Sequence, residues 1–254
     1  MNSAAYTAVD QAESEPELAM AITGKAPGVL AEEASRLGAP MVHFSTDYVF
    51  DGTANTPYRE CDQPNPLNVY GESKFRGEQA VRERLEQHLV LRTSWVYARR
   101  GKNFLTTMTR LFREKDEITI VDDQTGAPTW ARMIAETTAM MLARTGEDET
   151  RQVNNERWGL YHLSAADQTS WHGFAMKIRE LIAPDTNVRL LAIATKNYPT
   201  AARRPAFSVL DNSRLNTEWG LNMPSWETGL ELSAHSAGLR TDDTPYPVVA
   251  FPCI

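Results

Sequence analysis

Short apolar segments alternate with helical segments along most of the chain, and this alternation constrains the fold more than any other feature. The apolar segments have the length and composition of buried strands, and they lie at residues 40–45, 88–94, 118–121, 159–164 and 188–193. A segment of helical character follows each of them. Strands that alternate with helices are typical of a parallel sheet with connecting helices. The sequence therefore predicts an α/β fold with a largely parallel sheet.

Composition and charge exclude several classes of protein. The 254 residues carry 26 Lys and Arg against 33 Asp and Glu, a net charge of −7, without the basic stripe of a nucleic-acid binder. No apolar run reaches the ~18 residues of a membrane span, and the acidic N-terminus has no secretory signal pattern. The two cysteines, Cys61 and Cys253, are too few for a disulfide framework. We therefore expect a cytoplasmic protein without nucleic-acid or membrane partners.

The helical segment at residues 15–37 contains residues that disfavour a continuous helix. Pro27 lies between Gly24 and Gly28, and a proline inside a helix costs about 3 kcal/mol. We expect a break or kink near Pro27.

A tyrosine and a lysine lie four residues apart in Tyr70-Gly-Glu-Ser-Lys74, at the expected start of a helix. This spacing puts both side chains on one helix face. A nearby ammonium favours the phenolate and lowers the pKa of a tyrosine, so the pair can exchange protons with a carbonyl or an alcohol. The spacing alone favours the alternative, a surface tyrosine beside a solvated lysine.

A second polar group, Ser45-Thr46-Asp47, follows the apolar segment at 40–45. Ligands of open α/β sheets bind at the carboxyl ends of the strands, where a hydroxyl can hydrogen-bond a substrate carbonyl oxygen. Ser, Thr and Asp also end strands for local hydrogen-bonding reasons, and that alternative stays open on these three residues alone.

Several longer segments, taken in order, narrow the interpretation. The chain resembles the dTDP-4-dehydrorhamnose reductases, within the extended short-chain dehydrogenase/reductase superfamily. The resemblance is carried by NSAAYTAVDQAESEPELA at 2–19, VHFSTDYVFDG at 42–52, PLNVYGESKFRGE at 66–78, LRTSWVYARRGKNF at 91–104, VDDQTGAPT at 121–129, GLYHLS at 159–164, YPTAARRP at 198–205 and SW at 225–226. It implies a Rossmann-like sheet with a smaller C-terminal α/β domain that binds the substrate.

The resemblance also implies a division of the chain and a reaction. Residues 1–150 would bind NADPH or NADH, residues 151–238 would bind the sugar nucleotide, and residues 239–254 would form a tail. The substrate would be a dTDP-4-keto-6-deoxy sugar, whose C4 keto group is reduced. The choice between NADH and NADPH stays open.

Individual residues take their expected roles from the resemblance. Tyr70 would donate a proton to the C4 keto oxygen, Lys74 would hold the nicotinamide ribose and lower the pKa of Tyr70, and Thr46 would hydrogen-bond the keto group. The remaining cofactor-binding residues would lie in the turn Ala4, Ala5, Tyr6 and Thr7.

The sugar nucleotide would contact a further set of side chains. Asp47 and Val9 would lie beside the sugar, and Trp95 would line its pocket. Arg203 and Arg204 would suit the diphosphate, because a guanidinium pairs with phosphate in a bidentate manner. A solvated basic loop is the alternative for these two arginines.

Two departures from the family lead to expectations of their own. The family opens with a strand, a Gly-rich turn and a helix that bind the cofactor pyrophosphate, whereas this sequence contains no GxxGxxG. We therefore expect a chain truncated before its first strands. Some members hold a magnesium ion between subunits with a Glu after GAPT; Arg132 occupies that position here, and we expect no metal.

Three other functions remain as alternatives. A 4,6-dehydratase needs an acid directly after the Thr-Asp pair, where this chain has Tyr48. Reductase-like regulatory subunits use this fold for non-catalytic partner binding, and an inactive truncated fragment would do neither. The resemblance also allows a homodimer.

Overall fold

A parallel three-stranded sheet lies at the centre of the protein. The structure is a computed structural model that describes residues 1–146 and 157–235. Strands β1 (Met41–Thr46), β2 (His88–Thr93) and β7 (Gly159–His162) are parallel and adjacent in that order. The predicted α/β fold with a parallel sheet is confirmed.

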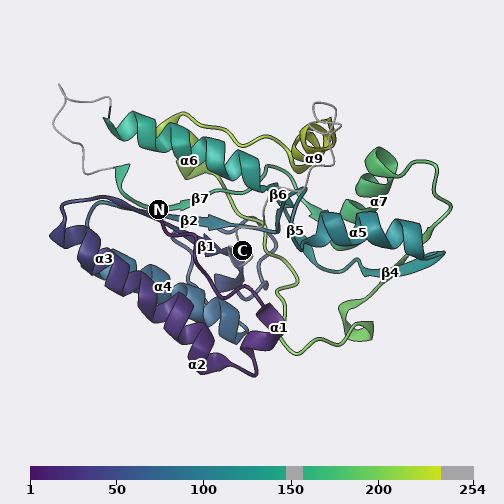
Figure 1. The fold of residues 1–254 in the computed structure, drawn as a ribbon, viewed down its shortest axis with the longest axis horizontal. Helices are drawn as coiled ribbons and strands as arrows, with labels where there is room; N and C mark the ends of the chain where they lie inside the picture. Colours follow the sequence, from purple (N-terminus) through teal and green to yellow (C-terminus); the bar gives the residue numbers. More distant parts are fainter. Residues whose placement is uncertain (147–156, 236–254) are drawn as a thin grey trace, which may run out of the picture.

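The central strand β2 is buried on both faces. Leu89 and Leu91 belong to a core that includes Met133 and Ile134 of α6 (Ala131–Gly146). The opposite face packs on the helices α3 (Ala26–Arg36) and α4 (Val69–Arg84), where Val90 contributes to a second core. Helices therefore cover both sides of the sheet (Figure 1), as parallel sheets require.

A second group of elements lies beside this layered unit (Figure 1). Its main contacts are a parallel strand pair, β4 with β9, and two packed helices, α5 and α7. Two shorter pairs, β3 with β6 and β5 with β8, complete the group. The bounds are β3 (Val96–Tyr97), α5 (Phe104–Glu114), β4 (Glu117–Val121), β5 (Thr125–Gly126), β6 (Thr129–Trp130), β8 (Thr169–Ser170), α7 (Trp171–Ile182) and β9 (Arg189–Ile193).

The remaining elements are short connections and two C-terminal helices. They are α1 (Val9–Ala12), α2 (Pro16–Ala19), the 3-10 helices η2 (Asp47–Val49) and η4 (Thr195–Asn197), α8 (Ser213–Trp219) and α9 (Trp226–His235).

Strand pairing links elements on both sides of residue 150. Strand β7 joins the sheet of β1 and β2, and β4 pairs with β9. The division into 1–150 and 151–238 stays a prediction, and its boundary, like the tail at 239–254, lies outside the described residues.

The expected break near Pro27 is a change of helix type. A π-helix, η1 (Met20–Lys25), leads directly into α3, and Pro27 lies in the first turn of α3. Because a proline has no N–H, the helical hydrogen bond that residue 27 would otherwise donate to the preceding turn cannot form. The segment therefore changes its hydrogen-bond register near Pro27 and continues as a helix.

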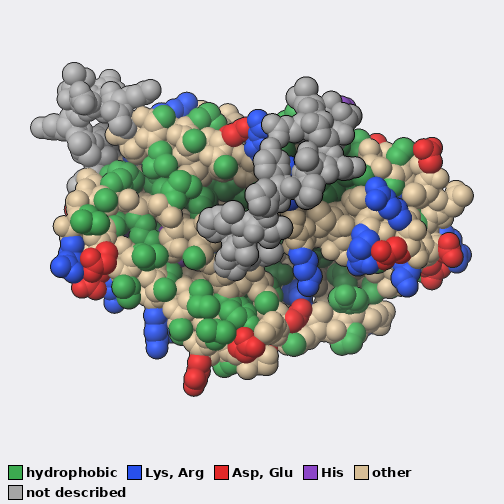
Figure 2. Space-filling model, viewed as in Figure 1, with side chains coloured by type: hydrophobic (Ala, Val, Ile, Leu, Met, Phe, Trp, Pro, Cys, Tyr) green, Lys and Arg blue, Asp and Glu red, His purple; other side chains and the backbone are tan. Residues whose placement is uncertain are grey.

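Part of the surface of α2, η1 and α3 is apolar. Leu18, Val29 and Leu37 are 48%, 61% and 79% exposed, respectively. Figure 2 shows hydrophobic side chains across the part of the face that α3 and α4 occupy.

Helix α4 is held in place by an N-cap at its start and by a close contact with η1. Its N-cap is Asn68, whose side-chain oxygen accepts a hydrogen bond from the Gly71 amide at 2.7 Å. A Cβ at Gly77 would lie 2.3 Å from the Thr23 carbonyl oxygen, so only glycine fits there. These contacts fix the position of α4 against η1 and the sheet.

A buried ion pair joins α4 to the sheet. Arg92 of β2 donates to both carboxylate oxygens of Glu78, with N···O distances of 2.9 and 2.7 Å, and both side chains are at most 1% exposed. The Ser45 hydroxyl of β1 also donates to Glu78. One carboxylate therefore connects α4, β1 and β2.

Replacing this carboxylate will destabilise the fold. Glu78→Gln removes the negative charge and leaves the Arg92 guanidinium buried without its counter-charge, which costs about 3–5 kcal/mol. Urea unfolding, followed by circular dichroism, measures the loss. The matched control is Glu72→Gln, which breaks an exposed pair with Arg76 and changes stability by about 0.5 kcal/mol or less. Equal effects of the two substitutions would contradict this account of the buried pair.

Candidate active site

A cavity of about 540 Å³ opens at the carboxyl ends of β1 and β2. Open α/β sheets bind their ligands at this edge. Six parts of the chain line it: the N-terminal segment, the end of β1, the segment after β2 and the starts of α4, α6 and α7. Thr46, Tyr70 and Lys74, the three predicted catalytic residues, all line this one cavity.

The side chains of Thr46 and Tyr70 lie together in the cavity, and hydrogen bonding from Thr46 lowers the pKa of Tyr70. Thr46 ends β1, and its hydroxyl oxygen also accepts from the Tyr48 amide at 3.2 Å. Tyr70 is the second residue of α4. The capped start of α4 therefore places a phenol beside the threonine hydroxyl, and both groups can reach the same ligand oxygen.

Lys74 is buried one helical turn after Tyr70. Its Nζ donates to the Phe44 carbonyl oxygen at 2.6 Å, and the residue is 4% exposed. Burial lowers the pKa of Lys74 to about 8, while the charge of Glu78 acts in the opposite direction. The ammonium is therefore held in the cavity as a cation whose proton is lost more readily than that of a free lysine.

The pKa of Tyr70 differs from the sequence prediction. Burial raises it to about 12, the Thr46 hydrogen bond opposes this, and the charge of Asp47 raises it further. The expected lowering by Lys74 was wrong for the ligand-free cavity, because desolvation of the phenolate outweighs its neighbours. At neutral pH Tyr70 is therefore fully protonated, as a proton donor must be.

Asp47, predicted to lie beside the sugar, lines the cavity and is 2% exposed. It accepts hydrogen bonds from Thr46 Oγ1 at 3.0 Å and from Ser94 Oγ at 3.1 Å, and Ser208 is a third partner. Burial raises its pKa to about 6, and the hydrogen bonds limit that rise. Asp47 is thus a carboxylate at pH 7, and it orients the Thr46 hydroxyl.

The N-terminal segment presents alternate residues to the cavity. Two of the four predicted cofactor-contacting residues of this turn line it, and two do not: Ala4 donates its amide to Asn2, and Tyr6 donates its hydroxyl to Glu15. The sequence analysis did not predict this alternation. An extended segment points every second side chain to the same side, and that pattern would have selected the residues that line the cavity. The lining residues are Ser3, Ala5, Thr7 and Val9.

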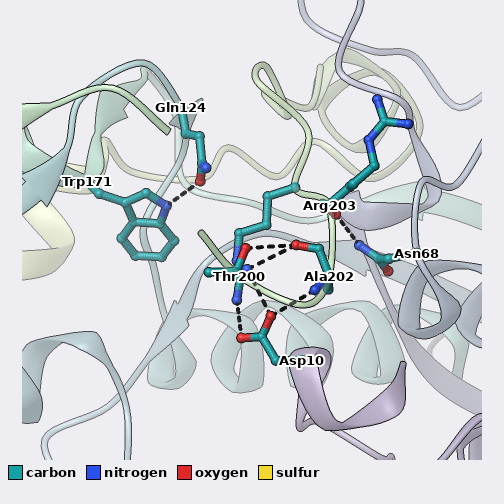
Figure 3. Close-up of polar contacts among 8 residues, drawn as sticks. Asp10, Asn68, Gln124, Trp171, Thr200, Ala202 and Arg203 are labelled. Atoms are coloured by element: carbon teal, nitrogen blue, oxygen red, sulfur yellow. Dashed lines mark hydrogen bonds and ion pairs between the residues drawn. The ribbon is translucent and has the colours of Figure 1, made fainter. Parts of the chain in front are cut away.

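The two predicted diphosphate-binding arginines are not among the cavity-lining residues. Arg204 donates to both oxygens of Asp10, at 3.1 and 2.7 Å, and Arg203 is exposed while its carbonyl oxygen accepts from Asn68 at 2.7 Å (Figure 3). Asp10 also accepts from the Ala202 amide at 3.0 Å. These contacts anchor the loop at 200–205 to α1.

Two basic side chains that were not predicted as site residues line the cavity instead. Arg100 and Lys102 line it, in the turn between β3 and α5. Trp95, a predicted sugar-pocket residue, lines it together with Trp171, which was not predicted. The basic run Ala98-Arg-Arg-Gly-Lys-Asn103 was the available signal for the two cations.

The described residues, 1–146 and 157–235, contain neither a cluster of metal ligands nor a membrane-spanning helix. In this part of the chain, no three His, Cys, Asp or Glu side chains are grouped as metal ligands. None of its helices is long and apolar enough to cross a membrane. Arg132 forms an exposed ion pair with Glu136 at 2.7 Å.

Several known proteins resemble the chain in sequence. Residues 1–237 match the family model described as the RmlD substrate binding domain. The dTDP-4-dehydrorhamnose reductase of Burkholderia thailandensis is 49% identical over 238 residues, which cover 91% of this chain and 79% of that protein. The Escherichia coli K12 protein of the same name is 43% identical over 242 residues, which cover 91% and 77%.

A solved structure of a dTDP-4-dehydrorhamnose reductase has the same fold as this chain. The dTDP-4-dehydrorhamnose reductase of Bacillus anthracis, in complex with NADP, superposes with a TM-score of 0.84 at 37% identity, covering 92% of this chain and 79% of that one. The predicted Rossmann-like fold is confirmed. The family model, the sequence identities and the fold together show that the chain belongs to the dTDP-4-dehydrorhamnose reductase family.

Proposed function

We propose that the protein reduces the C4 keto group of dTDP-4-dehydro-L-rhamnose to give dTDP-L-rhamnose, with NADPH or NADH as reductant. The observation that carries this proposal is that Thr46, Tyr70 and the buried Lys74 line one cavity at the carboxyl edge of the sheet. The relatives that bear this enzyme's name support the choice of substrate.

The cavity residues fit the nicotinamide end of such a cofactor. Lys74 offers a buried cationic donor, whose present partner is a backbone carbonyl, and the small side chains of Ser3 and Ala5 leave room beside it. When bound, the cofactor supplies the hydride that reduces C4. The Gly-rich turn that would hold its pyrophosphate does not occur in this sequence. NADPH and NADH both remain compatible with the described residues.

The protein's own residues handle the proton. Tyr70 and Thr46 both bind the keto oxygen, and Tyr70 transfers its phenolic proton to that oxygen as negative charge develops there. Lys74 stabilises the resulting phenolate by its charge. In the ligand-free cavity the single hydroxyl proton of Thr46 is donated to Asp47, and it turns to the keto oxygen when the substrate binds.

The alternatives make different demands on the same cavity. A dehydratase would need a carboxylic acid where Tyr48 stands, and burial raises the pKa of Tyr48 well above its usual range. A regulatory subunit or an inactive fragment would bind a partner or nothing, without turnover. The first experiment is therefore a reductase assay on this chain with both cofactors.

We further propose a cytoplasmic location and a homodimer. The biosynthetic role of the proposed reaction supports the location, and the exposed apolar side chains of α2 and α3 support self-association. Light scattering of the purified chain measures its mass directly.

Tyr70→Phe will nearly abolish turnover. The substitution removes only the proton donor, and general acid catalysis is worth about 10²–10⁴-fold in rate. We expect kcat to fall by at least about 100-fold while the KM for the sugar nucleotide changes little. NAD(P)H oxidation is followed by absorbance. Turnover that survives unchanged in the variant would exclude Tyr70 as the donor, whereas a folded wild-type chain without turnover would favour the binding-subunit or fragment alternatives.

Activity will decline as the pH rises through about 8. Lys74 is a cation below its pKa of about 8 and neutral above it, whereas Tyr70, with a pKa of about 12, stays protonated across this range. We therefore expect kcat/KM to fall on the alkaline side. Lys74→Arg keeps the charge at all these pH values, so its weaker activity should lose this alkaline decline. The same decline in both enzymes would contradict the assignment to Lys74.

Lys102, and not Arg203, will contribute to binding of the diphosphate. Both side chains are exposed, but only Lys102 lines the cavity. An exposed ion pair contributes up to about 1 kcal/mol, so Lys102→Ala should raise the KM for the sugar nucleotide about threefold to fivefold. Arg203→Ala is the matched control and should leave KM unchanged. The reverse result would restore the assignment made from the sequence.

A further inference from the structure

Trp95 has a strained backbone. Its φ of 45° lies in the left-handed region, which bulky side chains rarely adopt. Such strain persists only where the surrounding structure over-determines the conformation, and it is concentrated at ligand-binding positions. Some neighbouring group must therefore hold Trp95 in place.

Trp171 is that neighbour. The two indole rings are stacked, with centroids 3.6 Å apart and planes 4° from parallel. Gly126 closes the remaining space, because a Cβ there would lie 2.4 Å from Cε2 of Trp95. Both neighbours come from one antiparallel pair, since β5 ends at Gly126 and β8 leads directly into Trp171.

The ring of Trp171 is itself fixed by polar contacts. Its Nε1 donates to the side-chain oxygen of Gln124 at 3.2 Å (Figure 3), and Gln124 is 5% exposed. The Gln124 amide donates in turn to Thr195 Oγ1 at 3.0 Å, and that hydroxyl donates to Asp123 at 2.6 Å. Every donor in this series has its acceptor, so the indole plane of Trp171 has little freedom to rotate.

We propose that Trp171 is a positioning residue for the sugar, holding Trp95 in its strained conformation, and that Gln124 fixes Trp171. Both indoles line the cavity that contains Thr46 and Tyr70. The pair gives the bound sugar a rigid apolar surface without adding a group that reacts. This inference rests on the proposed function for its effect on the sugar, while its structural part can be tested without turnover.

The structural part is tested by circular dichroism of the full chain without ligand. Two indoles stacked in parallel planes give an exciton couplet in the far ultraviolet when their transition dipoles are rotated relative to each other within those planes. We expect Trp95→Phe and Trp171→Phe each to abolish this couplet, and the double variant to add no further loss. Trp158→Phe, a half-buried tryptophan outside the cavity, is the matched control and should keep it. A couplet that survives either cavity substitution would overturn the inference.

The functional part is tested by kinetics with dTDP-4-dehydro-L-rhamnose. Stacking of an aromatic pair makes a modest contribution beyond the area it buries, so Trp171→Leu should raise the KM about fivefold while kcat changes less than about twofold. Trp171→Phe keeps a ring and should recover most of the affinity. Gln124→Leu leaves both indoles present and should raise KM in the same direction, which covers the case in which Trp171→Leu fails to fold.

The outcomes separate this inference from the proposed function. A fall in kcat at constant KM, in either Trp171→Leu or Gln124→Leu, would assign these residues to general stability and overturn the positioning role. A wild-type chain without turnover would contradict the proposed function, and the dichroism couplet would then decide the positioning of Trp95 by itself.

Discussion

The buried Glu78–Arg92 pair is the interaction on which the rest of the site depends. It joins α4 to the sheet where no water can compensate either charge, so α4 has one favourable position relative to β2. Residues four apart share a helix face, which means that the face bearing Glu78 also bears Lys74 and Tyr70. The position of α4 that allows the ion pair to form therefore also places the phenol of Tyr70 and the ammonium of Lys74 at the end of β1.

Much of this arrangement was predictable from the sequence, because it depends on local patterns. The apolar segments became the expected strands, and the spacing of Tyr70 and Lys74 required only that a helix form. The basic residues were harder to place, since their surroundings are set by contacts between distant segments. Arg204 meets Asp10 across 194 positions, and neither residue's own neighbourhood in the sequence suggests the pair.

The direction of the pKa shifts could not be read from the sequence for a related reason. Proximity of Lys74 to Tyr70 suggested that charge would dominate, but burial penalises the charged form of both groups and displaces both pKa values towards the neutral species. Desolvation depends on the whole cavity, which no pair of residues reveals. The raised pKa of Tyr70 favours a reduction, because the phenol keeps its proton until negative charge develops on the substrate oxygen.

Residues from both groups of elements, the layered unit around the central sheet and the second group beside it, line the cavity. Contacts from both groups make the cavity rigid. The layered unit of β1, β2 and α4 carries the hydroxyls and the ammonium, whereas β5, β8 and α7 carry the surface against which Trp95 is stacked. Trp95 lies on the segment that leaves β2 for the second group, so its strained backbone lies at the junction of the two. A shift of either group would separate the stacked rings or move Trp95 relative to Thr46. The aromatic contact thus couples the position of the sugar to that of the proton donor, which the ion pair alone cannot do.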